Sequence, residues 1–407
     1  MSFLKKFRHT FHITIYEACI ALAVIITYFV LANTIYHGHP PLWFSISGFV
    51  VGGWLAFRPS EWAVTGLDSG SKYVGLSDYV AGILSSLASN LPEAVIAIML
   101  LTSKVGDKAT NQLIAVVTVL SAAGFNTLIL GIAILIATIK KRGSIDVPDD
   151  LEKRESPIIR WAIVALLMTV LFGFVQYAYF GKDDLDMAQL TIPVAAMLAA
   201  SYVIYLVYLI LVKNNTNKMA KHLEENKDTI EDDKVKTDGE HKEKSSHDQE
   251  LLSKPLTLLL LAMGFVGIYF GGHTLTENVQ HLLGTVPFFA TSKGPITAAL
   301  ILGAAGAIPE HSIAILSAAR DEIEVGIGNA MGGILQSALL IFGIIGIIVS
   351  ITLHPFVLIQ LGSIAGTLWF VKRCIHDGRF DTFEGIMIIV LQTLVFIILF
   401  EDIAILI

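Results

Sequence analysis

The sequence predicts an all-α, polytopic membrane protein, with one extra N-terminal helix followed by two inverted five-helix repeats. Three observations support this fold class. The 407 residues are 54% hydrophobic and only 15% charged, against roughly 25% charged residues in soluble domains. Several apolar runs exceed about 18 residues, the length that indicates a membrane span. A proline–glutamate pair inside a predicted span occurs twice, at Pro92-Glu93 and at Pro309-Glu310.

The apolar runs predict about eleven transmembrane helices. The second and the seventh are long and have polar C-terminal parts, which indicates that they tilt or end near an interface. The spans are expected near residues 12–33, 43–74, 77–102, 112–139, 158–180, 189–212, 255–283, 295–319, 325–351, 355–373 and 383–401.

The distribution of lysine and arginine predicts the orientation of these spans. With the N-terminus inside, the inner loops collect most basic residues, including the cluster Lys140-Lys141-Arg142. The outer side keeps only Lys104, Lys108, Lys182 and Lys293. We therefore predict a multi-pass protein of the cell (plasma) membrane, with a cytoplasmic N-terminus and an external C-terminus.

Four regions follow from this organisation. Residues 1–42 form the extra transmembrane helix and its loop, and residues 43–212 form the first five-helix repeat. Residues 213–254 are a hydrophilic cytoplasmic linker, and residues 255–407 form the second repeat. The linker mixes acidic residues and lysines with almost no apolar residues, which indicates disorder or an exposed helix. It is interpreted as a tether or as a calcium-binding regulatory segment.

The repeat is visible around the two Pro-Glu pairs, which lie 217 residues apart. Each pair is expected to break its helix and to free backbone carbonyls. Each is followed by a helix rich in Gly, Ala and Ser that carries amides, Asn126 in one half and Asn329 and Gln336 in the other. Because five is odd, equivalent helices cross the membrane in opposite senses. Such inverted repeats bind ions near the middle of the membrane.

A carboxylate within a span costs at least about 2.5 kcal/mol on insertion scales, so Glu93 and Glu310 are candidate functional residues. The pseudo-two-fold relation predicts that they face each other. Two carboxylates with neutral oxygens suit a hard divalent cation such as calcium, which takes six to eight oxygen ligands. The expected metal ligands are Glu93, Glu310, Ser89, Asn90, Asn126, Asn329, Gln336 and Ser337.

Two close carboxylates in a low dielectric cannot both stay ionised without a cation. Protons and calcium therefore compete for the same oxygens, which is the basis of an antiport mechanism. Glu93 and Glu310 are the expected proton-coupling residues. His311 could join them, since histidine titrates in the physiological range, although adjacent helical residues point about 100° apart.

These segments resemble the alpha repeats of the calcium/cation antiporter superfamily. Ser89-Asn90-Leu91-Pro92-Glu93 is similar to the first repeat, and the segment from Pro309-Glu310-His311 to Ile315 is similar to the second repeat of its proton/calcium branch. The stretch Gly332 to Gln336 resembles a further motif of that branch. The resemblance implies calcium efflux by alternating access, with Glu93 and Glu310 as central ligands.

Departures from the superfamily pattern bear on the counter-ion. Gly306-Ala307 stands where sodium/calcium exchangers carry hydroxyl residues, and Ala122 stands where they carry a serine. Because sodium sites need such oxygens, the predicted function is exchange of Ca²⁺ for H⁺. A Na⁺-driven calcium exchanger and an antiporter of another divalent cation remain alternatives.

An ion channel fits the inverted repeat less well. An enzyme is not expected, since no His-Glu-x-x-His pattern is present. The expected partners are calcium, proton or sodium, and the lipid bilayer. No cofactor and no nucleic acid are expected, and the sequence predicts no particular oligomeric state.

Overall fold

A computed structural model provides the coordinates. It describes residues 10–11, 13–36, 40–74, 87–104, 106–147, 149–180, 188–208, 252–287, 291, 293–320 and 323–400. Only the backbone is described at residues 149–156, 309–310, 312–313 and 324–325. The predicted linker lies outside the described residues up to position 251.

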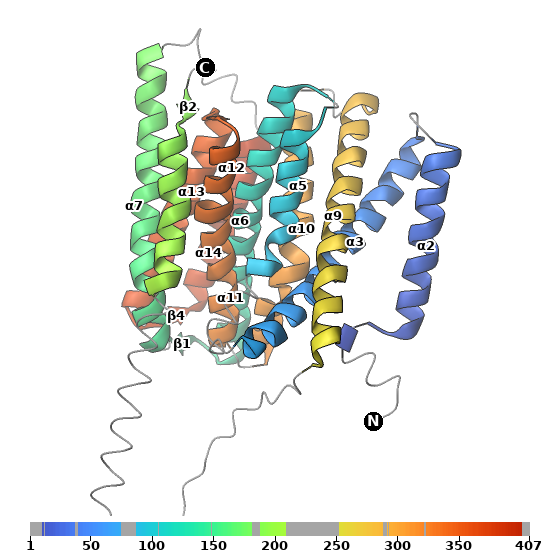
Figure 1. Cartoon of the computed structure of the whole chain (residues 1–407). Helices are drawn as coiled ribbons and strands as arrows, with labels where there is room; N and C mark the ends of the chain where they lie inside the picture. The colour runs from blue at the N-terminus through green and yellow to red at the C-terminus, as the bar shows by residue number, and fades with distance from the viewer. Residues whose placement is uncertain are drawn as a thin grey trace, which may run out of the picture.

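The molecule is a bundle of long helices that run side by side (Figure 1). Before residue 209 the helices are α2 (Ile15–Thr34), α3 (Leu42–Tyr73), α5 (Leu91–Thr102), α6 (Lys108–Lys140), α7 (Asp149–Phe180) and the helix Ile192–Tyr208. After residue 251 they are α9 (Lys254–Thr285), α10 (Lys293–Ala319), α11 (Ile323–Leu335), the π-helix η2 (Gln336–Ile341), α12 (Phe342–Ile348), α13 (Pro355–His376) and α14 (Thr382–Phe400).

The predicted polytopic all-α fold is confirmed. Each predicted span overlaps a helix, and seven helices of the described part are long and apolar enough to cross a membrane. Several bounds differ from the prediction. The span predicted at 325–351 consists of α11, η2 and α12, and the span predicted at 189–212 starts with two strand residues before its helix begins at Ile192. The number of crossings stays a prediction.

The two Pro-Glu segments differ in their backbone. Asn90 forms a turn, and α5 begins at Leu91 with Pro92 in its first turn, where a missing N–H costs nothing. By contrast, α10 continues through position 309 to Ala319. The prediction that the second helix is broken is therefore wrong. Neighbouring helices of a bundle can hold a proline-containing helix together.

Local sequence signals set other helix ends. Thr14 accepts a hydrogen bond from the Glu17 N–H at 3.1 Å and begins α2. Asp107 accepts one from the Thr110 N–H at 2.8 Å and begins α6. These are N-cap interactions, which satisfy N–H groups that lack an intrahelical partner. Gly378 has a φ of +74° after the end of α13, a conformation that glycine adopts without strain.

The helices α3 and α9 cross in close contact, with backbone against backbone. A Cβ on Gly264 would lie 2.7 Å from the Ala63 nitrogen, and a Cβ on Gly271 would collide with the backbone of Ala56. Small residues thus allow the approach, as they do in many membrane helix pairs.

Two short antiparallel strand pairs also join the part of the chain before residue 209 to the part after residue 251. β1 (Ser144–Asp146) pairs with β4 (Arg379–Asp381), and β2 (Gln189–Leu190) pairs with β3 (Ile351–Thr352). In Figure 1 the label of β2 lies near the upper end of the bundle and those of β1 and β4 near the lower end. β1 and β3 follow corresponding helices of the two predicted repeats, as do β2 and β4. Each strand of one predicted repeat thus pairs with a strand of the other, and the two pairs lie at opposite ends of the bundle. This arrangement agrees with an inverted repeat.

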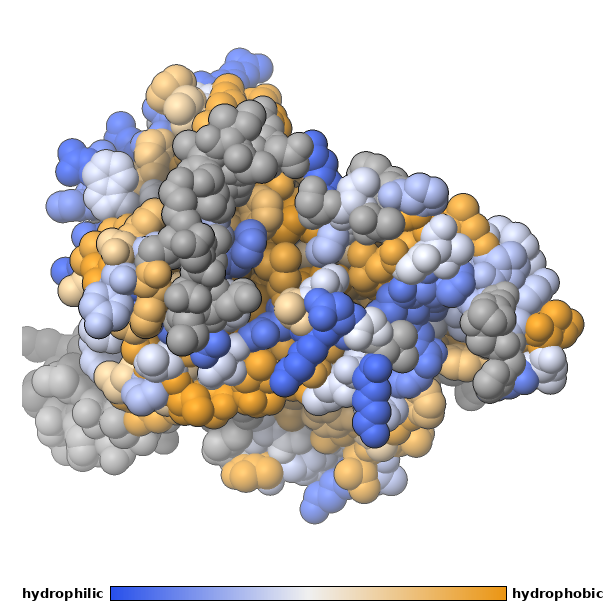
Figure 2. Space-filling view, turned by 90° about the horizontal axis from the view of Figure 1, so that it is seen from above, coloured by the Kyte–Doolittle hydropathy of each residue, from blue (hydrophilic) through white to orange (hydrophobic). Residues whose placement is uncertain are grey.

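The helices differ in how much of their surface is buried by other helices. In the most apolar 18-residue stretch of each helix, 72% is buried within the protein in α6 and 6% in α2. Helix α2 exposes large apolar side chains such as Ile20 and Leu22, as expected of a lipid-facing helix. Figure 2 shows one end of the molecule, where hydrophilic residues gather among hydrophobic ones. α6 packs against α10, α11 and α5, and the candidate site lies among these helices.

Candidate cation site

Glu93 is completely buried in the first turn of α5. Its Oε2 accepts a hydrogen bond from the Ser337 hydroxyl at 3.0 Å. Its Oε1 is buried and has no hydrogen-bond partner among the described residues. A buried carboxylate oxygen without a partner is costly. This oxygen is therefore free to accept a proton or to ligate a cation.

The helix α10 passes directly beside this carboxylate. A Cβ on Gly306 would lie 2.8 Å from Glu93 Cγ and 3.3 Å from Glu93 Oε1. Residues four apart lie on one face of a helix, so Glu310 occupies the next turn of the same face. The Glu310 side chain lies outside the described residues, as does that of Ser312. The predicted pairing of Glu93 with Glu310 remains a prediction, and the closeness of Gly306 supports it.

A hydrogen-bond network of amides and one imidazole surrounds the site. The Asn90 side-chain N–H donates to Gln336 Oε1. His311 Nε2 lies 3.3 Å from Asn90 Oδ1, and His311 Nδ1 lies 2.9 Å from Asn329 Oδ1. The network connects α5, α10, α11 and η2. It therefore brings together residues from both predicted repeats.

The protonation of His311 is linked to the orientation of these amides. A neutral imidazole carries one N–H, so it cannot donate to two amide oxygens at once. The bond from Asn90 to Gln336 fixes the Asn90 amide. Asn329 can rotate its amide by 180° and donate its own N–H to Nδ1, since oxygen and nitrogen are interchangeable in shape. A neutral His311, fully buried, then has both nitrogens satisfied.

Asn126 belongs to the same cluster. A Cβ on Gly333 would lie 2.5 Å from both Asn126 Nδ2 and His311 Cε1, so both side chains touch the same point of α11. Both polar atoms of Asn126 are buried without a partner among the described residues. Ser89 is half-buried one residue before Asn90. The structure thus brings together the described candidates from α5, α6, α11 and η2.

Sequence reasoning missed two hydroxyl groups. Thr118 and Ser121 on α6 are buried, and their hydroxyls have no partner in the described part of the chain. Thr127 on the same helix donates to the Ala123 carbonyl at 3.0 Å, the usual partner of a buried helical hydroxyl. A Cβ on Gly303 would lie 2.9 Å from Ser121 Cβ. The signal was available, since Thr118 and Ser121 are three residues apart and share a face.

The π-helix η2 was also not expected. It begins at Gln336, so it carries Gln336 and Ser337, which bond to Asn90 just before α5 and to Glu93 within α5. Single π-turns are frequent at functional sites. Here the wider turn coincides with the contact to α5.

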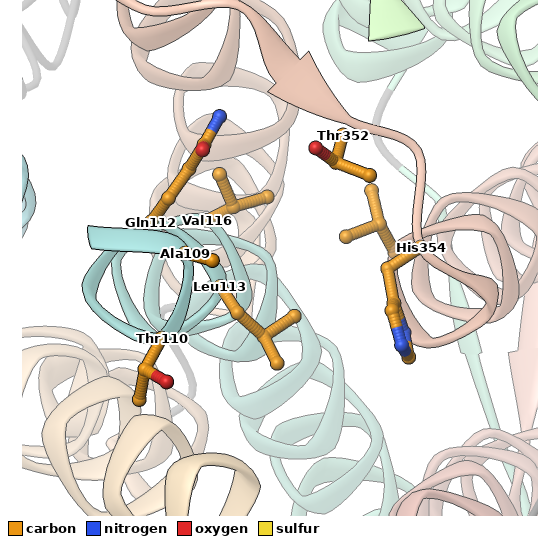
Figure 3. Close-up of a pocket in the computed structure, with 8 residues that line it drawn as sticks. Ala109, Thr110, Gln112, Leu113, Val116, Thr352 and His354 are labelled. Atoms are coloured by element: carbon orange, nitrogen blue, oxygen red, sulfur yellow. The ribbon is translucent and has the colours of Figure 1, made fainter. Parts of the chain in front are cut away.

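Two cavities lie outside this cluster. One, of about 190 Å³, separates the start of α6 from β3 and the start of α13, and Figure 3 shows Leu113 and His354 on opposite walls. The other, of about 480 Å³, lies between α5 and α9. Glu93 lines neither of these two cavities, and its side chain is fully buried.

Comparisons with known proteins agree with the fold. A family model described as sodium/calcium exchanger protein matches residues 42–211 and 256–400. A search of curated protein sequences finds no match.

Several solved structures share the fold. The H⁺/Ca²⁺ exchanger CAX superposes with a TM-score of 0.62 at 14% identity, over 95% of this chain and 92% of that one. YfkE superposes with 0.58 at 14% identity, over 93% and 99%. The sodium-calcium exchanger NCX_Mj superposes with 0.52 at 14% identity, over 87% and 98%. The family model matches both halves of the chain, and the chain belongs to the sodium/calcium exchanger protein family, within the calcium/cation antiporter superfamily.

Proposed function

We propose that this protein is a secondary antiporter that exchanges Ca²⁺ for H⁺ by alternating access, with the cation held between Glu93 and Glu310. The observation that carries this proposal is the buried Oε1 of Glu93, which has no hydrogen-bond partner among the described residues. A cation or a proton satisfies that oxygen, and the two cannot do so together. Competition for one oxygen couples the two fluxes.

The neighbouring groups fit a calcium ion. Calcium accepts neutral oxygens as well as carboxylates. Ser337 already contacts Glu93, and the amides of Asn90, Asn126, Asn329 and Gln336 lie in the same cluster. Ser89 is the remaining candidate ligand from the turn before α5. His311 either positions the amides or joins Glu93 and Glu310 in proton coupling.

Sodium as the driving ion is the second candidate. Thr118 and Ser121 supply two buried hydroxyls on α6 that have no partner within the described part of the chain. Hydroxyls are the kind of oxygen that the Gly306-Ala307 segment lacks. This observation favours a sodium-binding role for α6. Another divalent cation in place of calcium is the remaining variant of the proposal.

The deciding experiment measures calcium flux in sealed vesicles that contain the purified protein. A pH gradient and a sodium gradient are imposed separately. We expect calcium movement under the pH gradient in the absence of sodium. Calcium movement with sodium alone would overturn the proton assignment, and no movement under either gradient would overturn calcium exchange. Manganese and magnesium, tested in the same way, identify a different divalent substrate.

We further propose the orientation and location that the basic loops indicate. The N-terminus lies in the cytoplasm and the C-terminus lies outside, in the cell (plasma) membrane. Tags at either end of the full chain, probed in intact and in permeabilised cells, test this. An antibody that reaches the N-terminal tag in intact cells would contradict it.

A further inference from the structure

The turns that end α6 and α13 have the same hydrogen-bond pattern. After α6, the Arg142 N–H donates to the Ile139 carbonyl at 3.1 Å. After α13, the Gly378 N–H donates to the Ile375 carbonyl, also at 3.1 Å. In both turns the donor is the second residue after the helix, a position that is usually left-handed and usually glycine. Each turn leads into one strand of the β1–β4 pair, so the two turns are neighbours.

The two turns differ in the residue at this position. Gly378 has a φ of +74°, which glycine adopts without strain. Arg142 has a φ of +59°, and it is the one residue other than glycine with a positive φ in the described part of the chain. A side chain with a Cβ is strained in the left-handed conformation. The turn itself therefore favours glycine, and the arginine indicates a role for its side chain.

Two cations without a carboxylate partner lie in the turn after α6. Lys141 and Arg142 are both exposed, and neither forms an ion pair with a described carboxylate. The acidic residues of the adjoining strand and helix are Asp381 and Glu384, and the carboxylate of each accepts the backbone N–H of the other. Both carboxylates are thus engaged at the start of α14, and the two cations are available to a ligand.

This turn lies at the level of the lipid headgroups. The Thr382 hydroxyl, at the start of α14, donates to the Gly143 carbonyl at 3.3 Å. The 19 residues of α14 measure about 28 Å at 1.5 Å per residue, close to the roughly 30 Å of a bilayer's hydrocarbon core. The start of α14 therefore lies at one boundary of that core, where Phe383 is 65% exposed. Arg142 precedes Gly143 and lies at the same boundary.

We propose that Lys141 and Arg142 bind the phosphate group of an anionic phospholipid in the cytoplasmic leaflet. The guanidinium group of arginine donates two parallel N–H bonds to a phosphate, and the lysine adds a second positive charge. The exposed ring of Phe383 contacts the same lipid below its headgroup. Anionic lipids are enriched on the cytoplasmic side, which is the side that the proposed orientation gives to this turn. Neither cation belongs to the cation site described above.

The binding test uses the purified full chain in a neutral detergent and does not depend on transport. Phosphatidylglycerol, which is anionic, and phosphatidylcholine, which is zwitterionic, are added separately. The melting temperature rises as a lipid binds the folded state, and the midpoint of that rise gives the apparent affinity. We expect tighter binding of phosphatidylglycerol. Arg142→Gly and Lys141→Gln should each weaken it roughly fivefold, the usual contribution of one basic side chain near an anionic membrane.

The variant Arg142→Gly separates lipid binding from folding. Glycine removes the strain at a φ of +59°, so the melting temperature without lipid should not fall while lipid binding weakens. Arg142→Asn should behave in the same way, because asparagine also tolerates the left-handed conformation. The matched control is Arg373→Gln at the end of α13, where Arg373 lies 3.6 Å from Asp377. This control should bind phosphatidylglycerol as the wild type does.

Equal affinity of the wild type and Arg142→Gly for phosphatidylglycerol would overturn the proposal. Equal affinity of the wild type for the two lipids would overturn it as well. Displacement of the lipid by an equal concentration of inorganic phosphate would assign the surface to a free anion and not to a lipid. Binding should also weaken between about 0.1 M and about 1 M NaCl, because the Debye length falls from about 10 Å to about 3 Å. Binding that is independent of salt would overturn recognition by charge.

Discussion

The two Pro-Glu segments play different parts in the same site. The first is polar and interrupted: the chain turns at Asn90, and the side chain of Asn90 reaches Gln336 and lies beside His311. The second begins with small residues and lies in a continuous helix: α10 runs through position 309 and brings Gly306 against Glu93. One repeat thus supplies an amide and a buried carboxylate, and the other supplies the close approach. The two segments therefore contribute different groups to the proposed site.

The largest effect is expected from the carboxylates themselves. Glu93→Gln and Glu310→Gln each remove a carboxylate that binds the cation or the proton in the proposed mechanism. Loss of one member of a buried charge contact costs about 2–5 kcal/mol, so calcium flux should fall at least about 30-fold. Calcium flux in sealed vesicles measures this loss. If only one of the two variants loses calcium flux, the predicted pairing of Glu93 with Glu310 is wrong.

The matched control is Glu61→Gln. Glu61 pairs with Arg58 at 2.7 Å, and 44% of its side chain is exposed. An exposed pair contributes about 0–1 kcal/mol. Flux should therefore stay close to that of the wild type.

The second prediction tests the close approach of α10. In Gly306→Ala the added methyl would lie 2.8 Å from Glu93 Cγ, so the carboxylate or the helix must shift. Overpacking lowers the free energy of unfolding by about 1–3 kcal/mol, and we expect calcium flux to fall because Glu93 is displaced. Gly328→Ala on α11 is the control, because a Cβ there meets nothing within 4 Å. Normal flux in Gly306→Ala would show that α10 does not constrain Glu93.

The contrast between the two segments also shows which features of the structure can be predicted from the sequence. Hydropathy predicts the helices because each one must bury its backbone polar groups in lipid. The motif predicts that Asn90, Glu93 and Gln336 belong together. It does not predict that Ser337 bonds to Glu93, because that contact depends on the phase of the π-turn at η2. Nor does it predict continuity through Pro309, which depends on the packing of neighbouring helices.

The third prediction concerns the network that joins the two repeats. His311→Gln replaces the two ring nitrogens, which point in different directions, with one amide group, which we expect not to contact Asn90 and Asn329 together. One buried amide then loses its partner, at a cost of about 1–3 kcal/mol, measured as the free energy of unfolding. We expect slower exchange with the same pH dependence, because the glutamates carry the protons. A changed pH dependence would instead place His311 in proton coupling. His376→Gln, at the exposed end of α13, is the control.

The smallest effect is expected at the start of α6, outside both Pro-Glu segments. The Thr110 N–H and hydroxyl donate to Asp107, and these bonds lower the pKa of this exposed carboxyl. A lowered folded-state pKa means stability that is present above the unfolded pKa of aspartate and is lost as the pH falls through the folded value. Asp107→Ala should lower the melting temperature at neutral pH and not at acidic pH. Asp107→Asn, which keeps a capping oxygen, should recover most of the loss. Equal destabilisation by alanine at both pH values would show that the ionised cap contributes nothing.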